Sequence, residues 1–115
     1  TMSFAKSAKS SGRDMALPGS GLAIWHVDEL GDNQHEQMSA ALHYECSLVQ
    51  ADGRTDLEND PRNYGDATDL FGRGVNDHFG RGTNPSSTWW DGSQSTLDIS
   101  EISSAGPAMT FIGRV

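Results

Sequence analysis

The sequence predicts a mainly β fold, a small antiparallel sheet or sandwich of about four strands joined by long loops rich in Gly and Asp. Four stretches are rich in β-branched and aromatic residues or alternate apolar and polar residues, as strands that cover a core do. Turn residues separate these stretches, and the chain contains 13 glycines. Its 115 residues are enough for one domain with a modest core.

Residues 1–16 are rich in Ser, Ala and Lys and show no steady period. We predict a flexible lead-in here, or a strand separated from upstream partners, and assign residues 17–115 to a single β domain. The lead-in has lysines but no apolar central region, so it does not match a secretory signal peptide.

The first predicted strand is 21–29 (GLAIWHVDE), which follows a Pro-Gly turn and ends at another glycine. Alternation places His26 and Asp28 on the face that begins with Leu22 and Ile24. At the polar end of this strand, His26 and Asp28 could form a pair or contribute to a metal site. The alternative is a hydrogen bond that only orients the strand end.

The second predicted strand, 43–52 (HYECSLVQAD), alternates again and is expected to lie antiparallel to the first. Its Cys46 is the only cysteine, which excludes an internal disulfide and a cysteine-rich zinc site. We predict that Cys46 is a small buried core residue. Strands at 97–102 and 108–115 complete the set, with Leu97 and Ile99 facing inward.

The loop from Asp52 to Phe71 carries about half of the formal net charge of −8. It could be solvated, or a calcium ion could neutralise it. Its carboxylates are not spaced as in an EF-hand, but calcium accepts irregular cages of about six to eight oxygens. The predicted cage has two aspartates on each side of a turn at Pro61. Its residues are Asp52, Asp56, Asp66 and Asp69.

Trp89 and Trp90 are adjacent and would point to opposite sides of an extended chain. We predict that one belongs to the core and that the other could be a ligand platform, such as a surface on which a sugar stacks.

The segment His35 to Ser39 (HEQMS) matches the start of the zinc-protease signature HExxH but lacks its second histidine. Two histidines four residues apart are needed to present both nitrogens to zinc from one helical face. The next histidine is His43, so we do not predict a zinc site here.

The acidic composition, with a pI of about 4.7, argues against nucleic acid and against an anionic membrane surface as partners. No apolar run approaches the roughly 20 residues that a membrane span requires.

Several segments, in order, resemble the immune inhibitor A-like family of secreted bacterial zinc metallopeptidases. They are LPGSGLAIWHVDE (17–29), LVQADGRTDLE (48–58), GDATDLF (65–71), TNPSS (83–87), WDG (90–92) and ISSAGPAMTF (102–111). The resemblance implies a portion of a peptidase domain downstream of the HExxH helix, either as a fragment or as a relative without the catalytic half.

The resemblance also implies export and structural calcium near the aspartates at 52–69. Zinc, the upstream catalytic segment and the protein substrate would belong to a full-length parent, in which His26 and Asp28 would lie near the active site. The expected function is therefore that of a non-catalytic, calcium-stabilised portion of a metallopeptidase-like protein. The alternative is a calcium-dependent β module that binds carbohydrate or protein.

Overall fold

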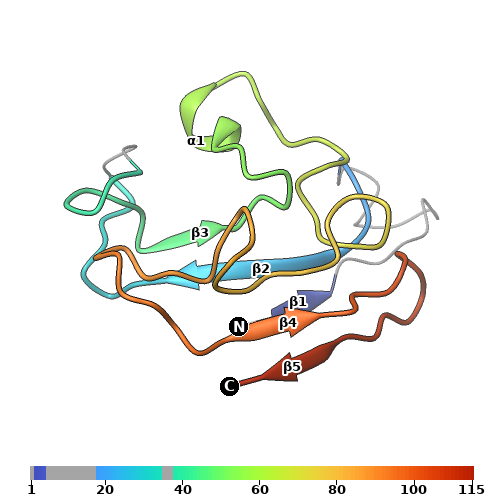
Figure 1. The fold of residues 1–115 in the computed structure, drawn as a ribbon. Coiled ribbons are helices and arrows are strands. Elements are labelled where there is room, and N and C mark those ends of the chain that lie inside the picture. Colours follow the sequence, from blue (N-terminus) through green and yellow to red (C-terminus); the bar gives the residue numbers. More distant parts are fainter. Residues whose placement is uncertain (1, 5–17, 35–37) are drawn as a thin grey trace.

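A computed structural model describes residues 2–4, 18–34 and 38–115 (Figure 1). The fold is mainly β and antiparallel with long loops, as predicted. Its elements are β1 (Met2–Phe4), β2 (Leu22–Val27), β3 (Cys46–Leu48), α1 (Asp56–Asn59), β4 (Asp98–Ser100) and β5 (Ile112–Arg114).

The strands form two small antiparallel sheets. In the first, β2 lies between β1 and β3, and Trp25 is paired with Leu48. In the second, β4 pairs with β5, with Ile99 opposite Gly113. The isolated bridge between Phe79 and Ile99 attaches the long middle loop to β4. No helix in the described part of the chain is long and apolar enough to cross a membrane.

Strand β1 lies within the segment predicted as a flexible lead-in. It pairs with β2 in a register that places Phe4 opposite Leu22. Three residues of the lead-in therefore form a strand, and the remainder of 1–16 lies outside the described residues. The division into a lead-in and one domain at 17–115 stays a prediction.

The predicted second strand is correct in direction, but its regular part is short. Hydrogen bonds nevertheless extend the pairing beyond β3, from Val49 N to Ile24 O (2.8 Å) and from Asp28 N to Glu45 O (2.8 Å). This extended pairing brings the chain around His43 beside the end of β2.

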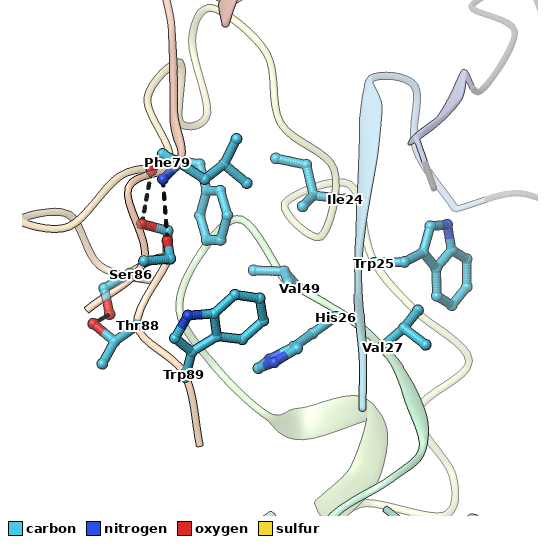
Figure 2. A pocket seen from close by; sticks show the side chains of 12 residues that line it. Ile24, Trp25, His26, Val27, Val49, Phe79, Ser86, Thr88 and Trp89 are labelled. Carbon is cyan, nitrogen blue, oxygen red and sulfur yellow. Dashed lines mark hydrogen bonds between the residues drawn. The ribbon is translucent and has the colours of Figure 1, made fainter. Parts of the chain in front are cut away.

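The two faces of β2 differ in burial. Leu22 and Ile24 lie in the core, whereas Trp25 and Val27 project from the opposite face and are exposed (Figure 2). The prediction that Cys46 is buried is wrong, because Cys46 is paired with Val27 on this uncovered face. Alternation identified the two faces but not the one that the rest of the chain covers.

The core joins both sheets to the two ends of the acidic loop. Ala51 and Phe71 flank that loop and are almost fully buried. Ala51 N donates to Asp69 O (2.9 Å), and Phe71 exchanges two backbone hydrogen bonds with Leu22 (2.8 and 3.0 Å). The loop is thus fixed at both ends to the sheet. The buried cluster comprises Leu22, Ile24, Ala51, Phe71, Phe79, Ile99 and Ile102.

Candidate functional site

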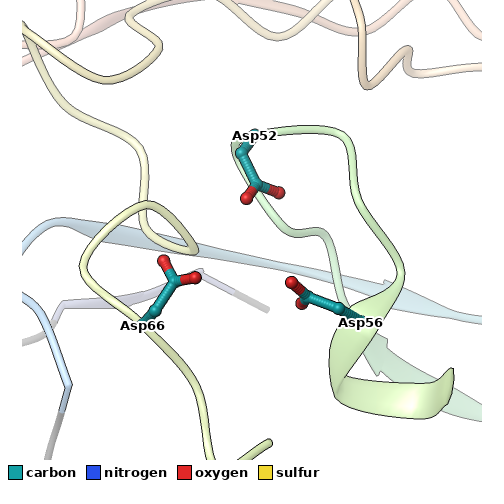
Figure 3. Close-up of side chains that lie close together, drawn as sticks. All are labelled: Asp52, Asp56 and Asp66. Atoms are coloured by element: carbon teal, nitrogen blue, oxygen red, sulfur yellow. The ribbon is translucent and has the colours of Figure 1, made fainter. Parts of the chain in front are cut away.

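Three aspartates of the acidic loop form a cluster that could hold a metal ion. Asp52, Asp56 and Asp66 each offer one carboxylate oxygen, and these oxygens lie within 4.8 Å of one another. Their carboxylates project from two arms of the loop into the same space (Figure 3). Asp52 directly follows the buried Ala51, while Asp56 begins the single turn of α1.

Thr68 connects the two arms of this cluster. Its hydroxyl lies 2.9 Å from Oδ2 of Asp52 and 2.5 Å from Oδ1 of Asp66. The hydroxyl and the backbone N–H of Thr68 both stabilise ionised Asp66, so the pKa of Asp66 is lowered from its ordinary value. Asp66 therefore keeps the negative charge that a cation ligand requires.

Asp69, the fourth predicted ligand, lies beside the cluster instead of within it. Its side chain is buried, with only 2% of the residue exposed. Asp69 Oδ2 accepts a hydrogen bond from the backbone N–H of Asp66 (2.6 Å), while Oδ1 has no partner among the described residues. Burial raises the pKa of Asp69, and the charges of Asp66, Asp56 and Asp52 raise it further.

Two further carboxylates indicate an excess of negative charge around the aspartate cluster. Oδ1 of Asp56 is also buried without a partner in the described structure. Glu58, which we did not predict as part of the site, accepts a hydrogen bond from Gln50 Nε2 (2.6 Å). Burial raises the pKa of Glu58, as do the charges of Asp56 and Asp69. A buried carboxylate without a partner is energetically costly, and a cation held by the cluster would reduce that cost.

A glycine allows the close approach of the loop to its surroundings. Gly65 has a φ of +100°, where a side chain is strained. A Cβ atom at this position would lie 2.7 Å from Cγ of Pro18 and 3.1 Å from Oδ2 of Asp69. The glycine therefore lets the backbone pass directly over the buried carboxylate.

The substitution Asp69→Asn should stabilise the metal-free protein at pH 7 by about 1 kcal/mol, the scale of one unsatisfied buried polar group. The amide oxygen can still accept from Asp66, while the NH2 group faces carboxylates. Because folding raises the pKa of Asp69, its contribution to stability is largest at low pH and is lost as the pH rises through the folded-state pKa.

Melting in EDTA at pH 7 and pH 3 tests this expectation. The difference between Asp69→Asn and wild type should shrink at pH 3, because the carboxyl of the wild type is then protonated. A variant that is less stable than wild type in EDTA at pH 7 would contradict the electrostatic explanation.

The end of β2 does not form the predicted pair between His26 and Asp28. Asp28 Oδ2 instead lies 2.9 Å from Nε2 of His43, whose Nδ1 is 2.9 Å from the carbonyl oxygen of Ser39. Both ring nitrogens of His43 therefore have a polar partner. The N–H of Leu30 and the contact with His43 lower the pKa of Asp28.

His43 was missed as a site residue because the sequence does not show which histidine meets Asp28. The chain reversal after β2 decides this, since Asp32 N donates to His43 O (2.8 Å) and brings the two strand ends together. The near-match to HExxH falls partly on residues 35–37, which lie outside the described residues.

The two tryptophans have different roles. The Trp90 ring stacks on His43 and His26, with centroid distances of 4.3 and 5.2 Å and interplanar angles of 12° and 10°. Its Nε1 is buried without a partner in the described structure, so Trp90 is packed and is not a free platform. Trp89 is 52% exposed and meets His26 at a tilt of 56°. Of the predicted pair, Trp89 is the ring that a ligand can reach.

No family model, curated protein or solved structure matches this chain.

Proposed function

We propose that this chain is a non-catalytic, calcium-stabilised portion of a secreted zinc metallopeptidase-like protein. The observation that carries the proposal is the acidic cluster of Asp52, Asp56 and Asp66 with Asp69 beside it. Oδ1 of Asp56 and Oδ1 of Asp69 are both buried and have no hydrogen-bond partner among the described residues. A bound cation would offset the mutual repulsion of these carboxylates. It would also hold the loop between Ala51 and Phe71 against the sheet.

Calcium fits the cluster better than other metals. All the candidate ligands are carboxylate oxygens, which suit hard cations and not zinc or copper. Calcium binds oxygen at about 2.3–2.6 Å, so two of its ligands can lie up to about 5 Å apart. Magnesium has shorter bonds, about 2.0–2.1 Å, and demands regular octahedral geometry. Ligands from an irregular loop meet the looser requirement more easily.

The peptidase context rests on the resemblance. Two resembling segments, 48–58 and 65–71, contain the three clustered aspartates and Asp69. In this proposal the parent is exported and binds zinc through an upstream catalytic segment, which acts on a protein substrate. This chain has no complete HExxH motif and contributes no zinc ligand.

Calorimetry should detect one calcium ion bound per wild-type chain. Asp56→Asn should weaken that binding at least about tenfold, the effect of losing one charged ligand interaction worth about 1.5–3 kcal/mol. Asp60→Asn is the matched control, because Asp60 has the same charge in the same loop but pairs with Arg62 outside the cluster.

Equal affinities of the Asp56 and Asp60 variants would contradict the metal site. A casein-cleavage assay with added zinc tests the non-catalytic assignment separately. Cleavage that is lost on replacement of His35 and Glu36 would show that the chain is itself a peptidase.

The exposed ring of Trp89 favours a second candidate, a calcium-dependent module that binds carbohydrate or protein. A glycan array probed with wild type and Trp89→Ala, with calcium and with EDTA, distinguishes this candidate from the first.

A further inference from the structure

A cavity of about 450 Å³ lies at the end of β2 and shares no residue with the acidic cluster. Its volume is within the roughly 300–1,000 Å³ of ligand pockets. Val27 and Leu30, both exposed, give it an apolar side, and the exposed Trp89 lines it from the loop before β4. Asp28 and Asp91 contribute carboxylates. The other lining residues are Ala40, Ala41, His43 and Trp90.

The charge of this cavity is negative. No Lys or Arg is found among the described residues that line it. The N–H of Leu30 and the contact with His43 lower the pKa of Asp28, and the hydroxyl and N–H of Ser93 lower the pKa of Asp91. Both carboxylates are therefore ionised at pH 7. Because the imidazole of His43 lies against Asp28, Asp91 is the carboxylate whose charge is left for a ligand.

A tight turn holds Asp91 and Trp89 together at the cavity. Trp89 N donates to Ser93 O (2.9 Å), and Gly92 N donates to Trp89 O (2.9 Å). Oδ1 of Asp91 accepts from the N–H and the hydroxyl of Ser93 (2.8 and 2.5 Å). Oδ2 of Asp91 accepts no hydrogen bond from the described residues. The turn thus presents an indole ring and a carboxylate oxygen to the same space.

The packing of Trp90 fixes the start of this turn. Its ring stacks on His43 with a centroid distance of 4.3 Å, and His43 is in turn held by Asp28 and by the carbonyl oxygen of Ser39. The neighbouring Trp89 therefore starts from an anchored backbone, and a ligand does not have to order the turn before it binds.

We propose that this cavity binds the side chain of an arginine from a peptide or protein partner, with the guanidinium group between the carboxylate of Asp91 and the ring of Trp89. A tryptophan face attracts cations, most often arginine. The planar guanidinium group can stack on the ring and donate to a carboxylate, and it leaves water more readily than an ammonium group does. The apolar stem of arginine suits the side formed by Val27 and Leu30.

Titration of the 15N-labelled protein with N-acetyl-argininamide tests the proposal. EDTA is present throughout, so the result does not depend on the calcium site. We expect saturable shift changes at the indole N–H of Trp89 and at the amides of Leu30 and Asp91, with a Kd on the order of a millimolar for so small a ligand. N-acetyl-citrullinamide has the same shape without the charge and should bind at least about fivefold more weakly. Equal binding of the two amides, or no saturable shifts with the first, would overturn the proposal.

Two substitutions test the assigned residues. Asp91→Asn keeps an oxygen that can accept from Ser93, and it should weaken binding about twofold to fivefold, as expected for an exposed ion pair. Asp77→Asn removes the same charge from an exposed residue outside the lining and should have a smaller effect. Trp89→Leu keeps an apolar side chain without the ring and should also weaken binding about twofold to fivefold.

Circular dichroism melts establish that each variant is folded. Equal losses for Asp77→Asn and Asp91→Asn would reduce the effect to net charge and overturn the assignment of Asp91. Unchanged binding by folded Trp89→Leu would overturn the assignment of the ring.

Two further ligands identify the cation and its source. N-acetyl-lysinamide should bind more weakly than N-acetyl-argininamide, and equal affinity would overturn the choice of guanidinium. Ethylguanidinium carries the same group without a backbone. Weaker binding of ethylguanidinium would support arginine of a peptide as the source, and equal binding would overturn the peptide in favour of a free guanidinium compound.

Discussion

Asp56→Asn should remove at least about half of the stabilisation expected from calcium at the proposed site. A ligand that binds only the folded state at a concentration of 100 times its Kd adds about 2.7 kcal/mol to the free energy of unfolding. For a domain of this size, that corresponds to a rise in melting temperature of roughly 10 °C. Oδ1 of Asp56 has no hydrogen-bond partner in the described structure. The substitution therefore weakens the proposed calcium site without breaking a hydrogen bond of that atom.

Thermal melts in EDTA and in millimolar calcium measure this effect. Wild type and Asp60→Asn should both show the calcium-dependent rise, while Asp56→Asn should show at most about half of it. In EDTA, Asp56→Asn should melt no lower than wild type, because it removes one of several repelling charges. A wild-type protein with the same melting temperature in both solutions would contradict a calcium-stabilised loop.

Phe71→Ala should destabilise the protein by about 3–5 kcal/mol, the range for truncating a buried aromatic residue. Phe71 is fully buried, packs edge-to-face on Phe79 at 5.7 Å, and is bonded through its backbone to Leu22. Such a loss is a large part of the roughly 5–15 kcal/mol that stabilises a typical domain.

Urea denaturation measures the loss, and two other substitutions serve as controls. Phe71→Leu keeps most of the buried volume and should cost less than about 2 kcal/mol. Ile112→Ala removes apolar atoms from a residue that is 39% exposed and should cost less than Phe71→Ala. If the alanine variants at positions 71 and 112 were equally stable, Phe71 would not be central to the core.

The strands were predictable because their signals are local. Alternation and β-branched residues in 21–29 place β2 correctly, and the turn residues after it favour an antiparallel partner. Alternation also places Leu97 and Ile99 toward the core, where Ile99 is fully buried and Leu97 is partly buried. The sequence of β1 has no comparable pattern of alternation or turn residues. Its three residues are placed in a strand by their pairing with β2.

The acidic loop was predictable in part. The number of carboxylates between Asp52 and Phe71 indicated an excess of negative charge in this loop. Three of the four predicted ligands lie together in the structure. The sequence did not separate Asp69 from the other three or identify Glu58 as a neighbour. Those distinctions depend on the path of the loop between its two ends.

The sequence by itself determined the fold class, the faces of β2 and the position of the acidic loop, because these follow from side-chain period, turn chemistry and local charge. Only the tertiary structure decided which face of β2 is covered, which histidine meets Asp28 and which tryptophan is free. Each of these outcomes depends on contacts between residues distant along the chain. The geometry of these contacts is set by the packing of the loops against both sheets, and a local sequence pattern does not contain that information.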